Sequence, residues 1–340
     1  MTTETDDVTL TLAGAPAIEG LRFRRLRVGD AAEFTAIAEL IGITHLEDRV
    51  PWLPTARQLQ DEFEGSSEID LARDLTLAEL EGHLVGIAGQ ERVLRDGVAV
   101  YELWGNVHPE VRRRGIGRTL LQENERRVAE RAASEPADQA VALAAQVDET
   151  QVGYRALVEG AGYEQIRWFF LMRRPTLEDI PDAPLPDGIE LRPVETDERR
   201  AILDAENEAF RDHWSAREQT EDDIAILLGR AELRTDLWVV AWAGDEIAGV
   251  VQNWIWRDEN ERLSVERGWL EHISVRRPWR RRGLARAITA ESLRRLKAAG
   301  MAEAMLGVDA ENPNGALGLY EGLGFEVEMR SASYRRSIER

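Results

Sequence analysis

One short motif occurs twice in this chain, each time between an apolar, strand-like run and a helix-like segment. The copies are Arg112-Arg113-Arg114-Gly115-Ile116-Gly117 and Arg280-Arg281-Arg282-Gly283-Leu284-Ala285. A helix N-terminus carries partial positive charge, so three arginines there are unfavourable unless an anion is present. Backbone N–H groups, a glycine turn and clustered arginines together favour phosphate binding. The chain is therefore predicted to contain two α/β units, each with a strand, a phosphate-binding turn and a helix.

The repeat extends well beyond the motif. Four residues separate Val107 and Val275 from their motifs, and Gly162 and Gly324 occupy matching positions after a short helix in each half. Self-similarity of this length indicates an internal duplication. Strands are expected at 21–28, 75–80, 83–93, 98–107, 141–147 and 163–172, and again at 189–194, 237–243, 246–255, 268–275, 304–308 and 325–334. Helices are expected at 30–41 and 116–132, and at 198–210, 220–229 and 284–299.

This order predicts a mixed α/β (α+β) fold of two tandem domains. Residues 1–20 are expected to form a flexible tail, because they are polar and acidic. The first domain should span 21–174 and the second 189–340. Residues 175–188 hold the one proline-dense stretch of the chain, which predicts an extended linker.

Composition narrows the classes of function. A net charge of −20 argues against nucleic acid as a partner, and makes the arginine clusters local sites for a polyanionic small molecule. The absence of cysteine excludes disulfides, thiolate zinc sites and a cysteine nucleophile, and the five histidines lack metal-ligand spacing, so no metal is expected. No apolar run is long enough to span a bilayer, and the acidic start is not a signal peptide. A cytoplasmic protein without a membrane partner is expected.

The order of strand, arginine–glycine turn, helix, strand and short helix resembles the GNAT N-acetyltransferase superfamily. The second half also carries a stretch from Asn312 to Phe325 that is similar to the family's Asn…Ala…Leu-Tyr…Gly-Phe signature. Asn312 lies one residue further from Tyr320 than is usual in the family. The tandem arrangement and its proline-rich junction further resemble mycothiol synthase and its relatives, in which the C-terminal domain is the active one.

The resemblance implies a mostly antiparallel sheet in each domain, with acetyl-CoA bound where two parallel strands splay apart. In the second domain these strands would be 268–275 and 304–308. Backbone groups of the first strand would hold the pantetheine arm, and N–H groups of the turn would hold the diphosphate. The implied acetyl-CoA-binding residues are Ile273, Ser274, Val275, Arg280, Arg281, Arg282, Gly283, Leu284, Ala285 and Asn312, with Val107, Arg112, Arg113, Arg114, Gly115, Ile116 and Gly117 in the first domain.

Two residues are the candidates for proton transfer. The family position of Tyr320 implies a general acid that protonates the leaving thiolate, and the alternative is a core aromatic residue. Glu271 is the candidate base, directly or through a water molecule, because a carboxylate in an apolar strand is costly without a role. Its alternative is an exposed or salt-bridged strand residue. Strand alternation places His272 on the opposite face, where a structural role is favoured.

The first half lacks this pair. Alignment at Gly162 and Gly324 puts Val158 at the position of Tyr320, and alignment at Val107 and Val275 puts Leu103 at that of Glu271. The N-terminal domain is therefore predicted to be non-catalytic, either binding CoA or serving only as a packing partner. Only Tyr101 and Glu102 lie where they would rescue an active first domain.

The leading functional hypothesis is an acetyl-CoA-dependent N-acetyltransferase that acetylates a primary amine of a small acceptor directly from its C-terminal domain. The alternatives are a CoA-binding regulatory protein without catalysis, and mycothiol synthesis itself. Trp254, Trp256 and Trp269 either line the acceptor site or pack in the core. Both a monomer and a homodimer are compatible with the duplication.

Overall fold

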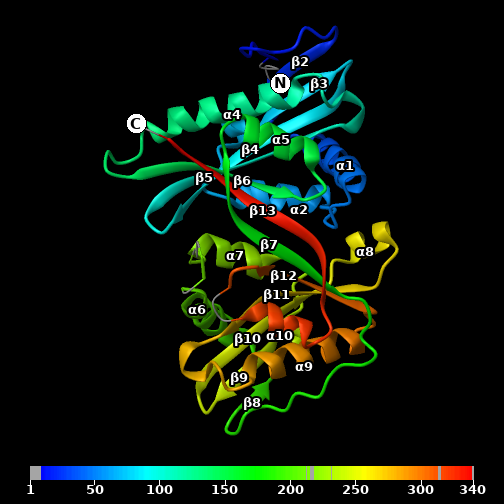
Figure 1. Ribbon diagram of the computed structural model, residues 1–340, viewed down its shortest axis with the longest axis vertical. Coiled ribbons are helices and arrows are strands. Elements are labelled where there is room, and N and C mark those ends of the chain that lie inside the picture. Colours follow the sequence, from blue (N-terminus) through cyan, green and yellow to red (C-terminus); the bar gives the residue numbers. More distant parts are fainter. Residues whose placement is uncertain (1–8, 212, 215–217, 231, 313–314, 339–340) are drawn as a thin grey trace, which may run out of the picture. The chain divides into compact units, whose positions relative to one another are not determined.

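The computed structural model describes residues 9–338 except 212, 215–217, 231 and 313–314. The chain forms two compact units (Figure 1). Unit 1 comprises Met1–Arg167 with Ala332–Arg340, and unit 2 comprises Trp168–Ser331. The C-terminal end of the sequence therefore belongs to the unit that is built mainly from the N-terminal half.

In the sheet of unit 1, the pairings from β1 to β5 are antiparallel and the next pairing is parallel. Its strands follow the order β1-β2-β3-β4-β5-β6-β13, and β5 and β6 are the parallel pair. That pairing ends at Glu102↔Ala144, although β5 continues to Val107, so the two strands separate beyond this point. The strands are β1 (Thr9–Leu10), β2 (Leu21–Arg25), β3 (Thr76–Leu80), β4 (His83–Arg95), β5 (Val98–Val107), β6 (Ala140–Asp148) and β13 (Glu326–Ile338).

Helices cover both faces of this sheet (Figure 1). Apolar side chains of α1 and α2 pack on Leu77 and Ile87, whereas Ile116 and Leu120 of α4 pack on Ala78 and Ala88 of the opposite face. Alternating residues of β3 and β4 thus supply two separate cores, as the period of two in a strand requires. The helices are α1 (Ala31–Asp48), α2 (Ala56–Gly65), α3 (Leu71–Asp74), α4 (Ile116–Ala132) and α5 (Val152–Gly160), with a 3₁₀ turn at Pro109–Val111.

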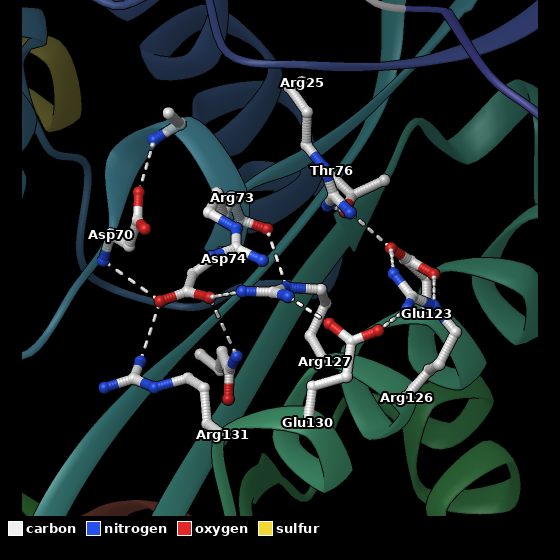
Figure 2. A network of polar contacts seen from close by, with 12 residues as sticks. Arg25, Asp70, Arg73, Asp74, Thr76, Glu123, Arg126, Arg127, Glu130 and Arg131 are labelled. Carbon is white, nitrogen blue, oxygen red and sulfur yellow. Dashed lines mark hydrogen bonds and ion pairs between the residues drawn. The ribbon is translucent and has the colours of Figure 1, made fainter. Parts of the chain in front are cut away.

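A polar network fixes α4 to the rest of unit 1 (Figure 2). The buried carboxylate of Asp74 accepts hydrogen bonds from Arg127 Nη2 at 3.1 Å and Arg131 Nη1 at 2.7 Å. One turn earlier on α4, Glu123 pairs with Arg25 and Arg126. These contacts fasten the helix that begins at the first arginine–glycine turn.

Unit 2 repeats the plan of unit 1. Its strands follow the order β13-β7-β12-β11-β10-β9-β8, and β11 and β12 are the parallel pair. Pairing between them ends at Trp269↔Met305, although β11 continues to Val275. The further strands are β7 (Glu164–Arg174), β8 (Glu190–Arg192), β9 (Val239–Ala243), β10 (Glu246–Trp254), β11 (Arg267–Val275) and β12 (Glu303–Asp309).

Two cores again sandwich the sheet. Leu284, Ile288 and Leu293 of α9 pack on one face, and Ile202 and Leu203 of α6 pack on the other. The helices are α6 (Arg199–Phe210), α7 (Glu221–Gly229), α8 (Arg257–Leu263), α9 (Leu284–Ala298) and α10 (Ala316–Glu321), with 3₁₀ turns at Thr196–Glu198, Thr235–Leu237 and Arg277–Trp279. None of the described helices is long and apolar enough to cross a membrane.

The predicted fold class is confirmed, because each unit is a mixed α/β sandwich with a parallel pair that splays. The structure differs from the sequence-based expectation at the N-terminus. Thr9 and Leu10 pair with β2, and Leu12 and Ile18 pack on the core below α4, so 9–18 is not a loose tail. These scattered apolar residues are too few to give a periodic signal, and only tertiary contacts order them.

The segment between the expected domains has no helix or strand over residues 175–189. Its side chains nevertheless pack on unit 2. Leu177 is fully buried in the core with α9, and its N–H donates to the carbonyl of Ala302 at 3.0 Å. Ile180, Ala183 and Leu185 also pack on that core, so the segment is anchored to unit 2 at several points.

Candidate active site

The two arginine–glycine turns have the same backbone conformation. Arg113 and Gly115 have φ of 64° and 93°, and Arg281 and Gly283 have φ of 60° and 85°. Glycine adopts this left-handed region without cost, whereas arginine does so against a steric penalty. Each turn then leads directly into its helix, with no side chain capping the first N–H groups. Both copies of the repeat thus adopt the same sterically unfavourable backbone at this turn.

The first arginine of each motif has a structural role. Arg112 Nε donates to the carbonyl of Val107 at 2.9 Å, and Arg280 Nε donates to that of Val275 at 2.8 Å. Arg112 also makes a bidentate ion pair with Asp48, and Arg280 Nη2 donates to the carbonyl of Ala209. Through these hydrogen bonds, the two arginines hold each turn against the end of the preceding strand. Their guanidinium groups thus make contacts within the protein itself, whereas the two arginines that follow in each motif are exposed.

The residues that precede the second turn line the splayed part of β11. Ile273 packs on the core beside α9, and the Ser274 hydroxyl donates to the carbonyl of Val250 at 3.4 Å. Their side chains are thus used within the unit. After Trp269, the backbone N–H and C=O groups of β11 on the side of β12 are no longer paired with β12, because the parallel pairing ends there.

A β-bulge interrupts β11 within this stretch. Val251 pairs with Ile273 and Asn253 pairs with Leu270, so Gln252 alone faces both Glu271 and His272. The expectation that strand alternation sends His272 to the face opposite Glu271 is therefore wrong, because a bulge interrupts the alternation. Bulges are frequent beside active sites, where they redirect side chains.

Glu271 is partly buried, and its carboxyl group lies near the positively charged groups of His272 and Arg230. Burial raises the pKa of its carboxyl group above the usual value, and the nearby cations of His272 and Arg230 oppose the shift. A carboxylate whose pKa is raised is a stronger base than one in water.

Three further residues surround His272. Its Nδ1 makes an ion pair with the buried carboxylate of Glu206 on α6, and Gln252 Nε2 donates to the other oxygen of that carboxylate at 2.7 Å. The ring of Phe210, one turn further along α6, meets the imidazole edge-on at a centroid distance of 5.7 Å. Sequence reasoning missed Glu206, although a carboxylate on the same helical face as Ile202 and Leu203 was a readable signal.

Tyr320 lies on α10 and is 6% exposed. Its ring packs edge-on against Phe325 at a centroid distance of 6.1 Å, and both belong to the core beside α9. Burial raises the pKa of the phenol above its usual value. Within the described part of the chain, no hydrogen-bond partner is found for its hydroxyl group, which leaves the proton available.

The loop before α10 includes Asn312. Its carbonyl accepts from the N–H of Gly315 at 3.1 Å, and its own N–H donates to the carbonyl of Asp309 at 3.1 Å. The backbone of Asn312 thus shapes the turn that joins β12 to the helix of Tyr320.

Three tryptophans lie at or near the C-terminal end of β10, close to the bulge. Trp254 and Trp256 stack with centroids 5.0 Å apart and planes 8° apart, and Trp254 is buried. Trp269 is the register partner of Trp254, and its Nε1 donates to Glu259 at 3.2 Å. Arg230 lies over the ring of Trp256 at 5.9 Å, which links this cluster to the surroundings of Glu271.

Unit 1 has no bulge at the matching place. Gly89 pairs with Trp104 in an unbroken ladder, so Trp104, rather than Leu103, stands where Glu271 and His272 lie in unit 2. The Trp104 ring covers Gly89 and stacks on Phe63 with centroids 5.3 Å apart. The sequence alignment was off by one residue because it carried no bulge.

Other groups occupy the remaining catalytic positions of unit 1. Val158 is fully buried, and the Tyr154 hydroxyl donates to the carbonyl of Leu103 at 3.2 Å, beyond the end of the parallel pairing. Tyr101 donates to Glu135 at 2.9 Å, and Glu102 pairs with Arg95. Both candidates for a rescued first site are thus engaged in contacts of the fold.

Known proteins share this architecture. Residues 37–155 and 199–325 match the model of the acetyltransferase (GNAT) family. The chain belongs to this family, and two matched regions make it a tandem GNAT acyltransferase. Over 275 residues it is 32% identical to a mycothiol acetyltransferase of Salinispora arenicola, covering 78% of this chain and 82% of that protein. It is 28% identical over 312 residues to one of Geodermatophilus obscurus, covering 91% and 96%.

Solved structures agree with the sequence relatives. A GCN5-related N-acetyltransferase from Sphaerobacter thermophilus superimposes with a TM-score of 0.74 at 27% identity, covering 95% of this chain and 97% of that one. A tandem GNAT protein from the clavulanic acid biosynthesis pathway superimposes with a TM-score of 0.65 at 18% identity, covering 94% and 99%. The second likeness concerns the fold alone.

Proposed function

We propose that this protein transfers the acetyl group of acetyl-CoA directly to a primary amine of a small acceptor, with the chemistry in the C-terminal domain, unit 2. The observation that carries the proposal is the bulge in β11, which gathers Glu271 and His272 opposite Gln252 where β11 parts from β12. Direct transfer to an amine that is protonated in water requires a positioned base, and Glu271 supplies a carboxylate there.

The proposed reaction has three proton transfers. Glu271, directly or through water, removes a proton from the acceptor ammonium, and the free amine attacks the thioester carbonyl carbon. The tetrahedral intermediate expels the CoA thiolate, which takes the proton of Tyr320. The nitrogen then gives up its second proton, which returns through water to the phenolate, so that a neutral amide, free CoA and neutral Tyr320 remain. The phenol hydroxyl, which has no partner among the described residues, is suited to that donation.

Acetyl-CoA binding is proposed for the backbone of Ile273, Ser274 and Val275, the turn from Arg280 to Ala285, and Asn312. The diphosphate would lie at the N–H groups after Gly283, where no described residue beyond its two chain neighbours comes within 4 Å of the position that a Cβ would take. Arg281 and Arg282 are exposed and would add positive charge.

A second candidate is mycothiol synthesis itself. It is favoured by the aligned mycothiol acetyltransferases, which the chain matches over most of their length. The amine would then belong to a cysteinyl-glucosaminyl-inositol. A CoA-binding protein without catalysis is the remaining alternative, and the retained pair of Glu271 and Tyr320 speaks against it.

The test is release of free thiol from acetyl-CoA in the presence of an amine panel that includes cysteinyl-glucosaminyl-inositol. Acetylation of one acceptor class, identified by mass, supports the proposed reaction, and preference for that compound selects the second candidate. CoA binding by calorimetry without release of CoA from acetyl-CoA in the presence of any of the amines would favour the regulatory alternative.

A further inference from the structure

Glu206 is a charged residue in the interior of unit 2. It lies on the buried face of α6 and is 2% exposed. One carboxylate oxygen accepts from Gln252 Nε2 at 2.7 Å, and the other makes an ion pair with His272 Nδ1. A buried carboxylate is costly unless it is paired and hydrogen-bonded. Both of its partners belong to the bulge, so the carboxylate is placed specifically against that irregularity.

The contact defines the orientation of the imidazole ring. Glu206 holds Nδ1, and Phe210 packs against the ring edge-on. The side chain of His272 remains 45% exposed, so the rest of the ring faces away from the core. A buried carboxylate at Nδ1 is a common way of fixing both the tautomer and the direction of a histidine.

The charged groups around His272 come from three elements. Glu206 lies on α6, and Glu271 precedes the histidine on β11. Arg230 follows α7, and its positive charge lowers the pKa of Glu271. Burial of the ring lowers the pKa of His272, but the charge of Glu206 and the hydrogen bond to it outweigh this effect and raise the pKa to about 9. An imidazolium at neutral pH would therefore stand between two carboxylates.

We propose that Glu206 is a positioning residue for acetyl transfer: it anchors His272 as a cation beside Glu271, and this cation keeps Glu271 ionised as a base at neutral pH. The inference rests on the proposed role of Glu271 and extends the site to α6. The physical logic is that burial disfavours the carboxylate of Glu271, whereas an adjacent cation favours it.

The histidine part is tested by NMR titration of the imidazole rings, with the His272 signal identified by its loss in His272→Gln. The wild type should titrate near pH 9, and Glu206→Gln should lower the midpoint by about 2 units or more, to the ordinary histidine range or below. Glu208→Gln, on the same helix and paired with Arg276, is the matched control and should leave the midpoint unchanged. A His272 that titrates in the ordinary range in the wild type, or identically in Glu206→Gln, would overturn the proposal.

The Glu271 part is tested on the same samples by ¹³C-carboxyl titration, with the signal identified in Glu271→Gln. Glu206→Gln and His272→Gln should both raise the Glu271 midpoint by about 1 unit, whereas the permanent cation of His272→Arg should hold it near the wild-type value. An unchanged midpoint in all three variants sinks the proposal, even if their melting temperatures fall. Neither titration needs an acceptor, so a failure of the amine panel would count against the proposed function without deciding this one.

Discussion

Burial acts on both proposed proton-transfer residues in the same direction and serves two different purposes. It raises the pKa of Glu271, which makes its carboxylate a better base, and it raises the pKa of Tyr320, which keeps the phenol protonated until a thiolate forms nearby. A thiol ionises below a phenol by more than one unit, so proton donation from Tyr320 relies on the apolar site disfavouring a free thiolate.

Tyr320→Phe keeps the ring that packs on Phe325 and removes only the hydroxyl. We expect kcat to fall by about 10²–10⁴-fold, while calorimetry gives an unchanged Kd for acetyl-CoA. Tyr163→Phe is the control, since that hydroxyl donates to Glu125 in unit 1 and should not affect turnover. Wild-type kcat in Tyr320→Phe would remove the assigned acid.

Glu271→Gln should lower kcat/KM by about 10²–10⁴-fold and raise the melting temperature at neutral pH. The stability effect has a defined pH dependence. Because the folded-state pKa is raised, the folded protein holds this proton more tightly, and wild-type stability is lost as the pH rises from the unfolded pKa through the folded one. In thermal melts from pH 4 upward, the melting temperature of the variant should therefore rise relative to that of the wild type as the pH increases. Parallel melting curves at all pH values would contradict a buried carboxylate.

Among secondary-structure elements, the two turns share their backbone and differ in their surroundings. Pro16 lies 3.4 Å from the position that a Cβ on Gly115 would take, whereas the corresponding space at Gly283 is open. Thr119, one turn into α4, also donates to the carbonyl of Gly14. In unit 1 the N-terminal segment therefore lies beside the turn. In addition, the Tyr154 hydroxyl donates a hydrogen bond to the carbonyl of Leu103 on the splayed strand β5.

These differences predict one CoA per chain. Gly283→Asp and Gly115→Asp form a matched pair, because both glycines have φ near 90° and each variant adds a carboxylate where a diphosphate would sit. Calorimetry should give one site in the wild type, no binding in Gly283→Asp and unchanged binding in Gly115→Asp. Two sites per chain, or a loss of binding through Gly115→Asp, would assign CoA to the first turn as well.

The network below α4 predicts a large stability effect far from any chemistry. Asp74→Ala leaves Arg127 and Arg131 without their shared carboxylate, which should cost about 3–5 kcal/mol of unfolding free energy. Asp61→Ala removes the exposed partner of Arg57 and should cost at most about 1 kcal/mol. Denaturant melts of both variants measure the contrast, and equal costs would show that the buried network contributes little.

At the scale of the whole molecule, the chain does not divide where its repeat divides. Residues 332–340 belong to unit 1, where Tyr334 donates to Glu159 at 2.9 Å and Arg336 to the carbonyl of Ala161 at 2.6 Å. Conversely, residues 169–174 of β7 pair with β12 of unit 2. Each unit is thus completed by a strand segment from the other half of the sequence.

This exchange predicts that the halves 1–174 and 189–340 depend on one another. Each half expressed alone should be aggregation-prone, because its sheet lacks a strand and exposes an edge. Coexpression should yield a complex that copurifies through a tag on one half. Two separately folded, monomeric halves in size-exclusion chromatography would show that the exchanged segments are dispensable.

The sequence alone determined the features that depend on neighbouring residues. The glycine turns, the strands and helices on either side of them and the duplication follow from local conformational preference and hydrophobic periodicity, and β5 and α4 begin and end at the predicted residues. The helix α2 was not predicted, although Thr55 and Gln58 form a capping box at its start.

Tertiary structure alone decided the bulge at Glu271 and His272, the carboxylate of Glu206 beneath it, and the exchange of strands between the two units. Each of these depends on register or contact between segments that lie far apart in the sequence. Backbone hydrogen bonds can form in more than one register between two strands. The register that forms is the one that buries the apolar side chains of the complete sheet.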